Sequence, residues 1–319
     1  MPDSVDTASA AEDLLGRHIR RREGEAAGRL PLLTAAGLTK DYGSFRALDA
    51  LDLRIASGEV FGLLGPNGSG KSTALRLMLG FLRPTAGRAT LAGFDCWAEG
   101  VEARKRVAYL PGELRLYETM TGRRLVTFLA GLRGETPGPA VDELAKKLDI
   151  DIDRPLTHMS SGMKRKVALL TVLVPRVPLI VLDEPTNTLD PTMRDELLDQ
   201  LAQAKARGQA VLFSSHVLQE VEAVCDRVGI LRRGKLVHLQ DMTELRDGRA
   251  VTARLTGPAP ATGPDGGPLP ADATADGRLT FTYRGPLPAL LVWLAGQPLA
   301  DLRIEPQGLG PIYRRWHGG

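Results

Sequence analysis

Short apolar runs recur along the chain, and longer segments of mixed polarity separate them. The clearest runs occupy residues 60–64, 179–182, 210–213 and 228–231. Such a run of consecutive apolar residues is typical of a strand that is buried on both faces, as in parallel sheets. The intervening segments have helical character, so the pattern predicts an α/β fold in which helices cover both faces of a parallel sheet.

Turn-forming residues divide the remaining segments. Paired short strands are predicted within residues 33–64, since Tyr42-Gly43 suits a hairpin turn. Helices are predicted over residues 72–82 and 192–206. Residues 104–147 are expected to be mostly helical, with breaks at the turn-forming positions Pro111, Gly112, Gly134, Pro137 and Gly138.

Composition divides the chain into three parts. Residues 1–30 are polar and Ala-rich, and we expect a flexible N-terminal extension whose basic cluster is solvated or contacts anionic lipid. Residues 31–248 contain the apolar runs and should form the main domain. Residues 249–319 should form a small α+β accessory domain with a Gly/Pro-rich loop at about 257–277. Its expected elements are strands at 251–255, 279–283 and 301–305 and a helix at 287–296.

Composition and charge exclude several classes of protein. The chain has 319 residues and a net charge of only +3, which does not indicate a nucleic-acid partner, and none is expected. Cys96 and Cys225 lack the spacing of a metal site or a disulfide scaffold, so we expect two buried thiols in a reducing compartment. The most apolar stretch, residues 167–182, is broken by two prolines and an arginine, and it falls short of the roughly 18 apolar residues that a membrane span needs.

The segment after the first apolar run carries a phosphate-binding motif. It matches G-x-x-x-x-G-K-[ST] between a predicted strand and a predicted helix. Glycines allow backbone N–H groups to surround phosphate oxygens, and the helix N-terminus favours the same anion. Lys71 would lie between the outer phosphates and the Ser72 hydroxyl would ligate Mg²⁺, so ATP and Mg²⁺ are the predicted cofactors. The expected nucleotide-binding residues are Gly65, Pro66, Asn67, Gly68, Ser69, Gly70, Lys71, Ser72 and Thr73.

Two carboxylates follow the apolar run at 179–182. Asp183 and Glu184 would lie at the carboxyl end of a central strand, where ligands of open α/β sheets bind. Asp183 is expected to hold the Mg²⁺ shell, and Glu184 to polarise the attacking water. His216 follows the strand at 210–213 through two serines, and a histidine there can donate a hydrogen bond to a γ-phosphate. Glu184 and His216 are therefore the candidate catalytic residues.

In this order along the chain, the motifs resemble those of the nucleotide-binding domain of ABC transporters, over about residues 33–240. Tyr42 lies where the family places an aromatic residue that stacks on adenine, and His216 matches the family's switch histidine. The acidic motif corresponds to Asp183, Glu184, Pro185 and Thr186, the signature to Ser160, Ser161, Gly162 and Met163, and the dimer-contact loop to Asn187, Thr188, Leu189 and Asp190. Taken alone, the signature tetrapeptide would be interpreted as an N-cap and turn.

The resemblance implies a P-loop NTPase core with an inserted helical subdomain at about residues 100–165. It also implies a head-to-tail dimer with a second copy of the chain, in which each ATP lies between the phosphate loop of one subunit and the signature of the other. Ser160 and Gly162 would then contact a γ-phosphate bound by the partner chain, because the N–H groups at a helix N-terminus face an anion there.

The chain departs from the family pattern in the loop that joins the two subdomains. The family usually has Gln in this loop, and that Gln contacts Mg²⁺ and the attacking water. This chain has Gly112 followed by Glu113. Glycine has no side chain to ligate a metal, so either Glu113 substitutes or water does, and both alternatives stay open.

The resemblance favours the ATP-hydrolysing subunit of an exporter that acts through a separate polytopic membrane subunit. The segment between Lys71 and Ser160 contains no heptad run and no Cys cluster, which disfavours the chromosome and repair types of ABC ATPase. The residues at 109–112 and the accessory domain resemble the drug and antibiotic exporter branch, which includes daunorubicin-resistance subunits. A soluble ABC ATPase acting on the ribosome or DNA, and the ATPase of an importer, are the alternatives.

A membrane partner implies a location at the cytoplasmic face of the membrane, with the chain bound peripherally. We expect the docking surface near residues 112–121, where Tyr117 and Met120 could be either contacts or core residues. The transported substrate is selected by the membrane chain in this architecture, so drugs, antibiotics and lipid-like molecules all fit.

Overall fold

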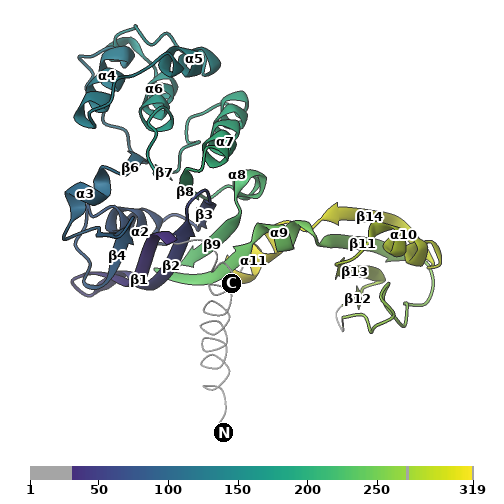
Figure 1. The fold of residues 1–319 in the computed structure, drawn as a ribbon. Helices are drawn as coiled ribbons and strands as arrows, with labels where there is room; N and C mark the ends of the chain where they lie inside the picture. The colour runs from purple at the N-terminus through teal and green to yellow at the C-terminus, as the bar shows by residue number, and fades with distance from the viewer. Residues whose placement is uncertain (1–30, 271–272, 318–319) are drawn as a thin grey trace. The chain divides into compact units, whose positions relative to one another are not determined.

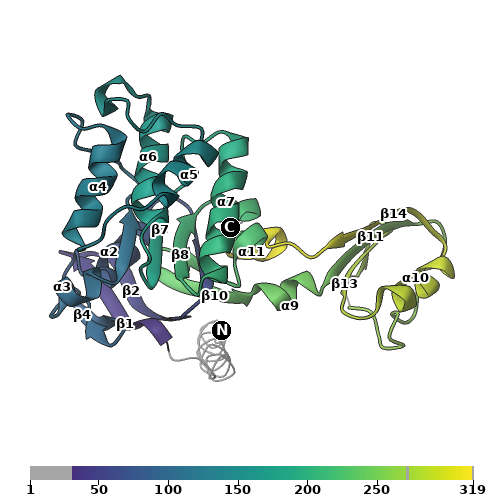
Figure 2. The ribbon, with the colours of Figure 1, turned by 45° about the horizontal axis from the view of Figure 1, so that its top comes forward.

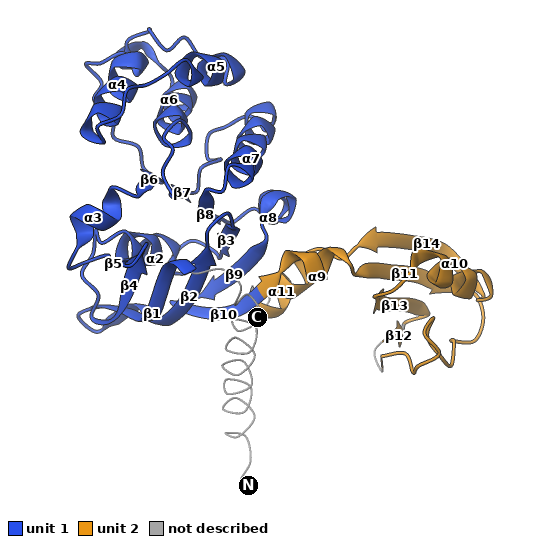
Figure 3. Ribbon diagram, viewed as in Figure 1, with its two compact units in different colours: residues 1–239 blue, residues 240–319 orange. Residues whose placement is uncertain are grey.

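The computed structural model describes residues 31–270 and 273–317. The predicted extension at residues 1–30, with its basic cluster, lies outside the described residues. The chain divides into two compact units, residues 1–239 and 240–319, which Figure 3 colours separately. Each unit is described by itself below.

A six-stranded sheet forms the centre of the first unit, with the strand order β10-β9-β3-β8-β7-β6. Neighbouring strands are parallel from β9 to β6, so the predicted parallel α/β sheet is confirmed. The four apolar runs form strands β3, β7, β8 and β9, and the first three are buried along their whole length. The strands are β3 (Val60–Leu64), β6 (Val107–Leu110), β7 (Leu179–Asp183), β8 (Ala210–Ser215), β9 (Arg227–Arg232) and β10 (Lys235–Asp241).

A second, antiparallel sheet covers one face of the parallel sheet, which the sequence pattern did not predict. Its strands are β1 (Pro31–Tyr42), β2 (Phe45–Ala56), β4 (Ala86–Leu91) and β5 (Phe94–Asp95), in the order β2-β1-β4-β5. The predicted hairpin at Tyr42-Gly43 is present, but its strands are twelve residues long rather than short. Phe61 of β3 packs into the core beneath this sheet, together with Leu75 of α2.

Helices cover the opposite face of the parallel sheet. Side chains alternate between the two faces of a strand, and the next residue of β3, Gly62, points toward helix α8. A Cβ atom at Gly62 would lie 2.8 Å from both Val221 and Cys225. The helices of this unit are α2 (Lys71–Met78), α3 (Gly100–Arg104), α4 (Gly122–Leu132), α5 (Ala140–Lys147), the short 3-10 helix η1 (Leu156–His158), α6 (Ser161–Leu173), α7 (Pro191–Ala206) and α8 (Leu218–Val224).

Two predicted helical segments need correction. The helix predicted over 72–82 ends at Met78, because Gly80 has a φ of +66° and its missing Cβ leaves room for the carbonyl oxygen of Cys96. The segment 104–147 contains β6, a strand that pairs with β7 and buries three of its four residues. This run is too short to be separated from a helix by its periodicity.

Helices α4, α5 and α6 gather at one end of the first unit, away from the antiparallel sheet (Figures 1 and 2). They have a small core of their own, built on Leu125, Leu156, Met159 and Val167. Helix α6 connects this group to the parallel sheet, since the chain runs from Leu173 through residues 174–178 into β7.

The second unit is an antiparallel sheet with one helix packed on it. The predicted strands and helix of the accessory segment are present, and β11, β13 and α10 share a core that includes Val251, Phe281 and Leu290. A final helix, α11, was not predicted. The elements are α9 (Met242–Arg246), β11 (Arg249–Leu255), β12 (Thr274–Ala275), β13 (Arg278–Tyr283), α10 (Leu287–Ala295), β14 (Leu299–Pro306) and α11 (Gly310–His317).

The two cysteines are buried, as predicted, and neither forms a disulfide. Burial raises the pKa of the Cys96 thiol to about 12, and the neighbouring Asp95 carboxylate acts in the same direction. Among the described residues, none of the helices combines the length and the apolar character needed to cross a bilayer. The apolar stretch 167–182 is divided between helix α6 and strand β7.

Candidate nucleotide-binding and hydrolysis site

The phosphate loop joins β3 to α2 and turns tightly at its start. A Cβ atom at Gly65 would lie 2.4 Å from Ser69 Oγ and 2.5 Å from the carbonyl oxygen of Leu231, so the backbone passes where no side chain fits. Pro66, Asn67 and Gly68 are exposed at the tip, and Ser72 and Thr73 are half-buried in the first turn of α2. Glycine at this close approach and free N–H groups at the helix start form the cradle that a phosphate needs.

Lys71 lies inside this loop and is only 5% exposed. Its Nζ donates hydrogen bonds to the carbonyl oxygens of Gly65, at 2.7 Å, and of Pro66, at 3.2 Å. The same ammonium lies 3.3 Å from Glu184 Oε1. The hydroxyl of Ser69 is buried and has no hydrogen-bond partner within the described chain. The phosphate loop therefore contains both a buried positive charge, on Lys71, and a hydroxyl without a described partner, on Ser69.

The two carboxylates lie at the carboxyl end of β7, as the sequence predicts. Asp183 is buried, and its Oδ1 accepts a hydrogen bond from Ser214 Oγ at 2.6 Å. Ser214 is the register partner of Asp183 on the parallel strand β8, and its Oγ also accepts from the backbone N–H of Glu184 at 3.0 Å. One serine therefore orients both acidic residues, because parallel strand ends meet at the same edge of the sheet.

Glu184 is surrounded by three polar side chains from different segments. Its Oε1 faces Lys71, and its Oε2 accepts from Asn187 Nδ2 at 2.9 Å and lies 3.3 Å from His216 Nδ1. Burial acts to raise the pKa of Glu184, but the Asn187 hydrogen bond and the Lys71 charge outweigh it, so this pKa lies below its ordinary value. Glu184 is consequently an anion at neutral pH, able to accept a proton from water.

His216 follows β8 and is 48% exposed, so it faces both Glu184 and solvent. The segment that carries it is anchored by Glu220 of α8, a buried residue that sequence reasoning missed. Glu220 Oε2 accepts hydrogen bonds from Ser215 Oγ, at 2.8 Å, and from Thr186 Oγ1, at 3.0 Å. The two bonds tie the end of β8 to the loop that follows Glu184.

Arg165 is the second residue that sequence reasoning missed. It belongs to helix α6, is buried, and among the described residues donates hydrogen bonds to carbonyl oxygens alone: those of Pro111, Gly112, Asp183, Glu184 and Pro185. Burial lowers the pKa of its guanidinium, and the nearby carboxylates of Asp183 and Glu184 oppose that effect. The signal in the sequence was slight, since Arg165 lies in a basic run of three residues and its neighbours are not buried.

Tyr42 ends β1 at the tip of the hairpin and is half-exposed. The Nζ of Lys40 lies 5.1 Å from the centre of its ring. The hairpin is next to the phosphate loop, since the carbonyl oxygen of Ala47 lies 2.8 Å from the position of a Cβ atom on Gly70. An exposed ring beside this loop is suited to stack on a base.

The signature residues lie at the start of α6. Ser160 is the N-cap residue, and its Oγ accepts from the backbone N–H of Met163 at 3.2 Å. Ser161 is exposed, while Gly162 and Met163 are half-buried. A Cβ atom on Gly162 would lie 3.4 Å from the carbonyl oxygen of Thr188. The structure thus brings the signature beside the loop 187–190, whereas no hydrogen bond joins it to the phosphate loop in the part of the chain described here.

The loop 187–190 links Glu184 to helix α7. Asn187 and Thr188 are exposed, Leu189 is buried, and Asp190 caps α7 by accepting from the backbone N–H of Met193 at 3.0 Å. Thr188 has a φ of +71°, a left-handed conformation that costs free energy for a β-branched residue. An exposed and strained tip is typical of a segment that contacts a ligand or a partner.

A side chain at position 112 would start beside the Asp183 carboxylate, whereas Glu113 is exposed. A Cβ atom on Gly112 would lie 3.6 Å from Asp183 Oδ2, an ordinary van der Waals contact. Glu113 is exposed and makes no hydrogen bond or ion pair to any described residue. Carboxylate and hydroxyl oxygens are the ligands that Mg²⁺ prefers, and one or two protein ligands beside phosphates and waters are its usual set. Asp183, whose Oδ2 accepts no hydrogen bond from the described residues, and Ser72 fit that requirement.

A phosphate loop after β3, a lysine within it and two acidic residues at the end of β7, on the far side of β8, define a P-loop nucleoside triphosphatase. The profile described as "ABC transporter" matches residues 48–187. A relative with 32% sequence identity aligns with this chain over 70% of its own length. The chain therefore belongs to the ABC transporter family of ATP-binding proteins. It binds ATP and is an ATPase.

Three similar proteins illustrate this membership. The linearmycin resistance ATP-binding protein LnrL of Bacillus subtilis (strain 168) is 32% identical over 219 residues, which are 67% of this chain and 70% of LnrL. The daunorubicin resistance ATP-binding protein DrrA3 of Streptomyces coeruleorubidus is 35% identical, over 67% of this chain and 69% of its own. A solved ATP-binding subunit of an ABC transporter is 28% identical with a TM-score of 0.62, over 67% of this chain and 92% of that chain.

Replacing Arg165 with methionine should lower the free energy of unfolding by roughly 3 kcal/mol, because the carbonyl oxygens that it binds lose their buried donor. Urea unfolding followed by circular dichroism measures this change. Lys166→Met on the same helix is the matched control and should change stability by less than about 0.5 kcal/mol. Equal stability of the two variants would show that water replaces the guanidinium without cost.

Proposed function

We propose that this chain is the ATP-hydrolysing subunit of an exporter for a drug, antibiotic or lipid-like molecule. It works as a head-to-tail dimer at the cytoplasmic face of the membrane and acts through a separate membrane subunit. The observation that carries the proposal is the convergence of Lys71, Glu184 and His216 at the phosphate loop. The relatives named for linearmycin and daunorubicin resistance support the choice of an exporter.

Hydrolysis in this proposal depends on a competition for Lys71. The ammonium is shared between two backbone carbonyls and Glu184. A γ-phosphate carries more negative charge than the carbonyl oxygens or the Glu184 carboxylate, so it draws the Lys71 ammonium toward itself. This movement frees Glu184 Oε1. Glu184 then accepts a proton from the water that attacks the γ-phosphorus, the bond to the bridging oxygen of ADP breaks, and inorganic phosphate leaves. His216 donates a hydrogen bond to the γ-phosphate oxygens.

Ser72 and Asp183 would hold Mg²⁺ in the same proposal, and the bound ion would supply charge neutralisation at the outer phosphates. Ser214 holds Asp183 in place through Oδ1, so Oδ2 remains available as the ligand. Glu113 is exposed and makes no hydrogen bond or ion pair with a described residue, so in this proposal a water molecule rather than Glu113 takes the place of the family's Gln.

Gly112→Gln tests this assignment, because a side chain at position 112 starts beside Asp183 Oδ2 without a steric clash. The variant should reach half-maximal ATPase activity at a Mg²⁺ concentration roughly tenfold lower, since a further oxygen orients the metal shell. The measurement is a Mg²⁺ titration of steady-state hydrolysis. Glu113→Ala is the control and should leave the titration unchanged. A loss of turnover in Glu113→Ala would instead assign the metal role to Glu113.

The dimer is supported by the exposed position of the signature. Ser160 and Ser161 are exposed at the N-terminus of α6, next to the strained tip at Thr188, and no hydrogen bond joins them to the phosphate loop within the described residues. Free N–H groups at a helix start attract an anion. In the proposed dimer this anion is the γ-phosphate held by the phosphate loop of the second copy.

A mixing experiment distinguishes a composite site from a site within one chain. Lys71→Ala removes the phosphate charge and Ser160→Arg blocks the signature, so each variant alone should lose ATPase activity. A dimer of one copy of each keeps one intact site, and an equal mixture should regain roughly a quarter of native turnover if the subunits pair at random. Thr157→Arg, at an exposed position three residues before Ser160, is the control and should remain active. Normal hydrolysis by Ser160→Arg alone would contradict the composite site.

Exposed aromatic side chains mark the surface proposed for the membrane subunit. Tyr117 is 58% exposed, and its ring packs edge-on against that of the exposed Phe128, with 5.9 Å between the ring centres. Trp97 and Val101 are also exposed and line a cavity of about 440 Å³ with Gly80. Met120 packs against the core of the helical group, so of the two predicted residues only Tyr117 is available to a partner. Tyr117 and Phe128 remain uncovered beside each other, which is typical of apolar residues at a protein interface.

Copurification from membranes tests the transport role. The full chain should be recovered from detergent extracts with a polytopic subunit, and Tyr117→Glu should release it into the soluble fraction by placing a charge in an apolar interface. Leu302→Glu, at an exposed apolar position in the second unit, is the control and should remain bound. Recovery of the native chain on ribosomes or DNA, without a membrane protein, would overturn the exporter proposal.

A further inference from the structure

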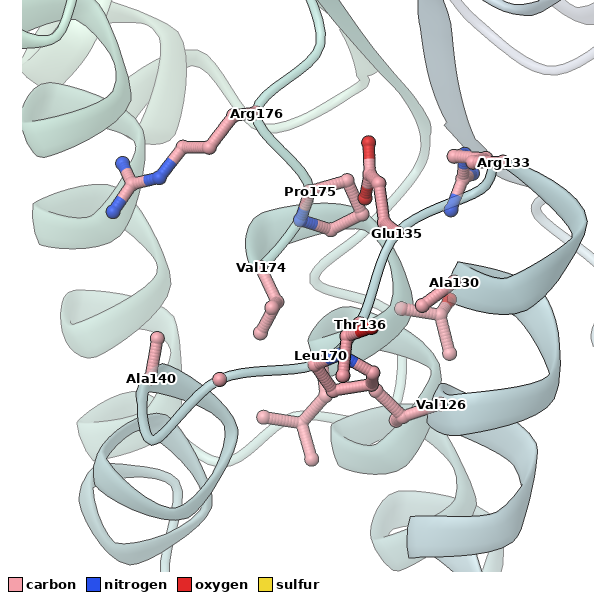
Figure 4. A pocket seen from close by; sticks show the side chains of 13 residues that line it. Val126, Ala130, Arg133, Glu135, Thr136, Ala140, Leu170, Val174, Pro175 and Arg176 are labelled. Carbon is pink, nitrogen blue, oxygen red and sulfur yellow. The ribbon is translucent and has the colours of Figure 1, made fainter.

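A cavity of about 370 Å³ lies within the helical group, away from the phosphate loop. It is bordered by helix α4, by the loop 133–138, by the start of α5 and by the C-terminal part of α6 with the segment that follows it (Figure 4). Its volume is at the lower end of the range of small-molecule binding sites. None of the residues placed in nucleotide binding or hydrolysis lines it.

Apolar side chains form one wall of this cavity. Two of these side chains, Val126 and Ala130, come from α4. The others are Leu170 of α6 and Val174 at its C-cap, and Figure 4 shows Val126 and Leu170 together at the base of the cavity. Water bound against such a wall finds few hydrogen-bond partners, so the wall favours the apolar part of a ligand.

Arg133 supplies a polar group that has no partner. Its Nη1 is buried and makes no hydrogen bond within the described chain. Burial lowers the pKa of this guanidinium, and the charge of Glu135 acts in the opposite direction. A buried N–H group without an acceptor is destabilising, and a charge-assisted bond to an anion would satisfy it.

The charge around the cavity is positive overall. Arg133 and Arg176 line it together with a single acidic residue, Glu135. Burial is the main cause that lowers the pKa of Arg207, and the positive charge of Arg176 acts in the same direction. Arg207 therefore lies close to Arg176. In Figure 4, Arg133 and Arg176 lie on opposite sides of the cavity. This distribution attracts an anion and disfavours a cation.

We propose that this cavity binds a small organic carboxylate with an apolar body. Arg133 Nη1 donates to the carboxylate, and the apolar body lies against Val126, Ala130 and Val174. An inorganic anion would leave the apolar wall uncovered, and a neutral apolar molecule would leave Arg133 without an acceptor. A ligand with both parts satisfies the two walls at once.

Isothermal titration of the full chain with decanoate tests the proposal, at concentrations below micelle formation. Decanoate should bind with a stoichiometry of about one per chain. Inorganic phosphate tests the charge alone and 1-decanol tests the apolar part alone, and each should bind at least tenfold more weakly. Equal binding of decanoate and 1-decanol, equal binding of decanoate and phosphate, or no decanoate binding would each overturn the proposal.

Three variants locate the binding to this cavity. Arg133→Gln should weaken decanoate binding by roughly tenfold or more, because it removes the charge-assisted bond. Arg124→Gln is the matched control, since Arg124 is exposed on the same helix, and its affinity should equal that of the native chain. Thr136→Trp fills the cavity from an exposed loop position where folding is not at risk, and it should abolish binding. If both Arg133→Gln and Thr136→Trp bound decanoate with the affinity of the native chain, the decanoate would bind elsewhere and the proposal would be wrong.

Discussion

The buried guanidinium of Arg165 is the interaction on which the arrangement of the site depends. It binds the carbonyl oxygens of Pro111 and Gly112 on one side and those of residues 183–185 on the other. The helix that begins with the signature is thereby fixed to the loop beside Asp183 and to the end of β7. Five acceptors on one planar group leave little freedom for any of these segments to move alone.

The acidic residues are held by neutral groups as well as by charges. Ser214 orients Asp183 and the backbone of Glu184, and Glu220 ties the end of β8 to the loop after Glu184. Glu184 itself has a φ of +47°, an uncommon backbone conformation that persists because these bonds surround it. The carboxylate of Glu184 is therefore preorganised by the fold itself.

The sequence predicts the parts of the fold that depend on local pattern. Buried strands such as β3 and β7 are apolar throughout, and parallel strand ends bring Lys71, Glu184 and His216 together, so these features follow from the chain itself. Strand β6 was missed because four residues between helical segments carry no usable periodicity. Arg165 and Glu220 were missed for another reason. Arg165 binds carbonyl groups at residues 111–112 and 183–185, and Glu220 binds Thr186 as well as the nearby Ser215, so most of these partners belong to other segments. A basic or acidic residue in a helix ordinarily indicates solvent exposure.

The burial of both cysteines has a practical consequence for following the motion of this ATPase. A thiol whose pKa is raised to about 12 has almost no thiolate at neutral pH, and thiolate is the form that reacts with alkylating labels. Cys96 and Cys225 are both enclosed in the core. The native cysteines should therefore react little with thiol labels. A single cysteine placed at an exposed position such as Thr188 or Ser161 will carry a spectroscopic probe without removal of the native thiols.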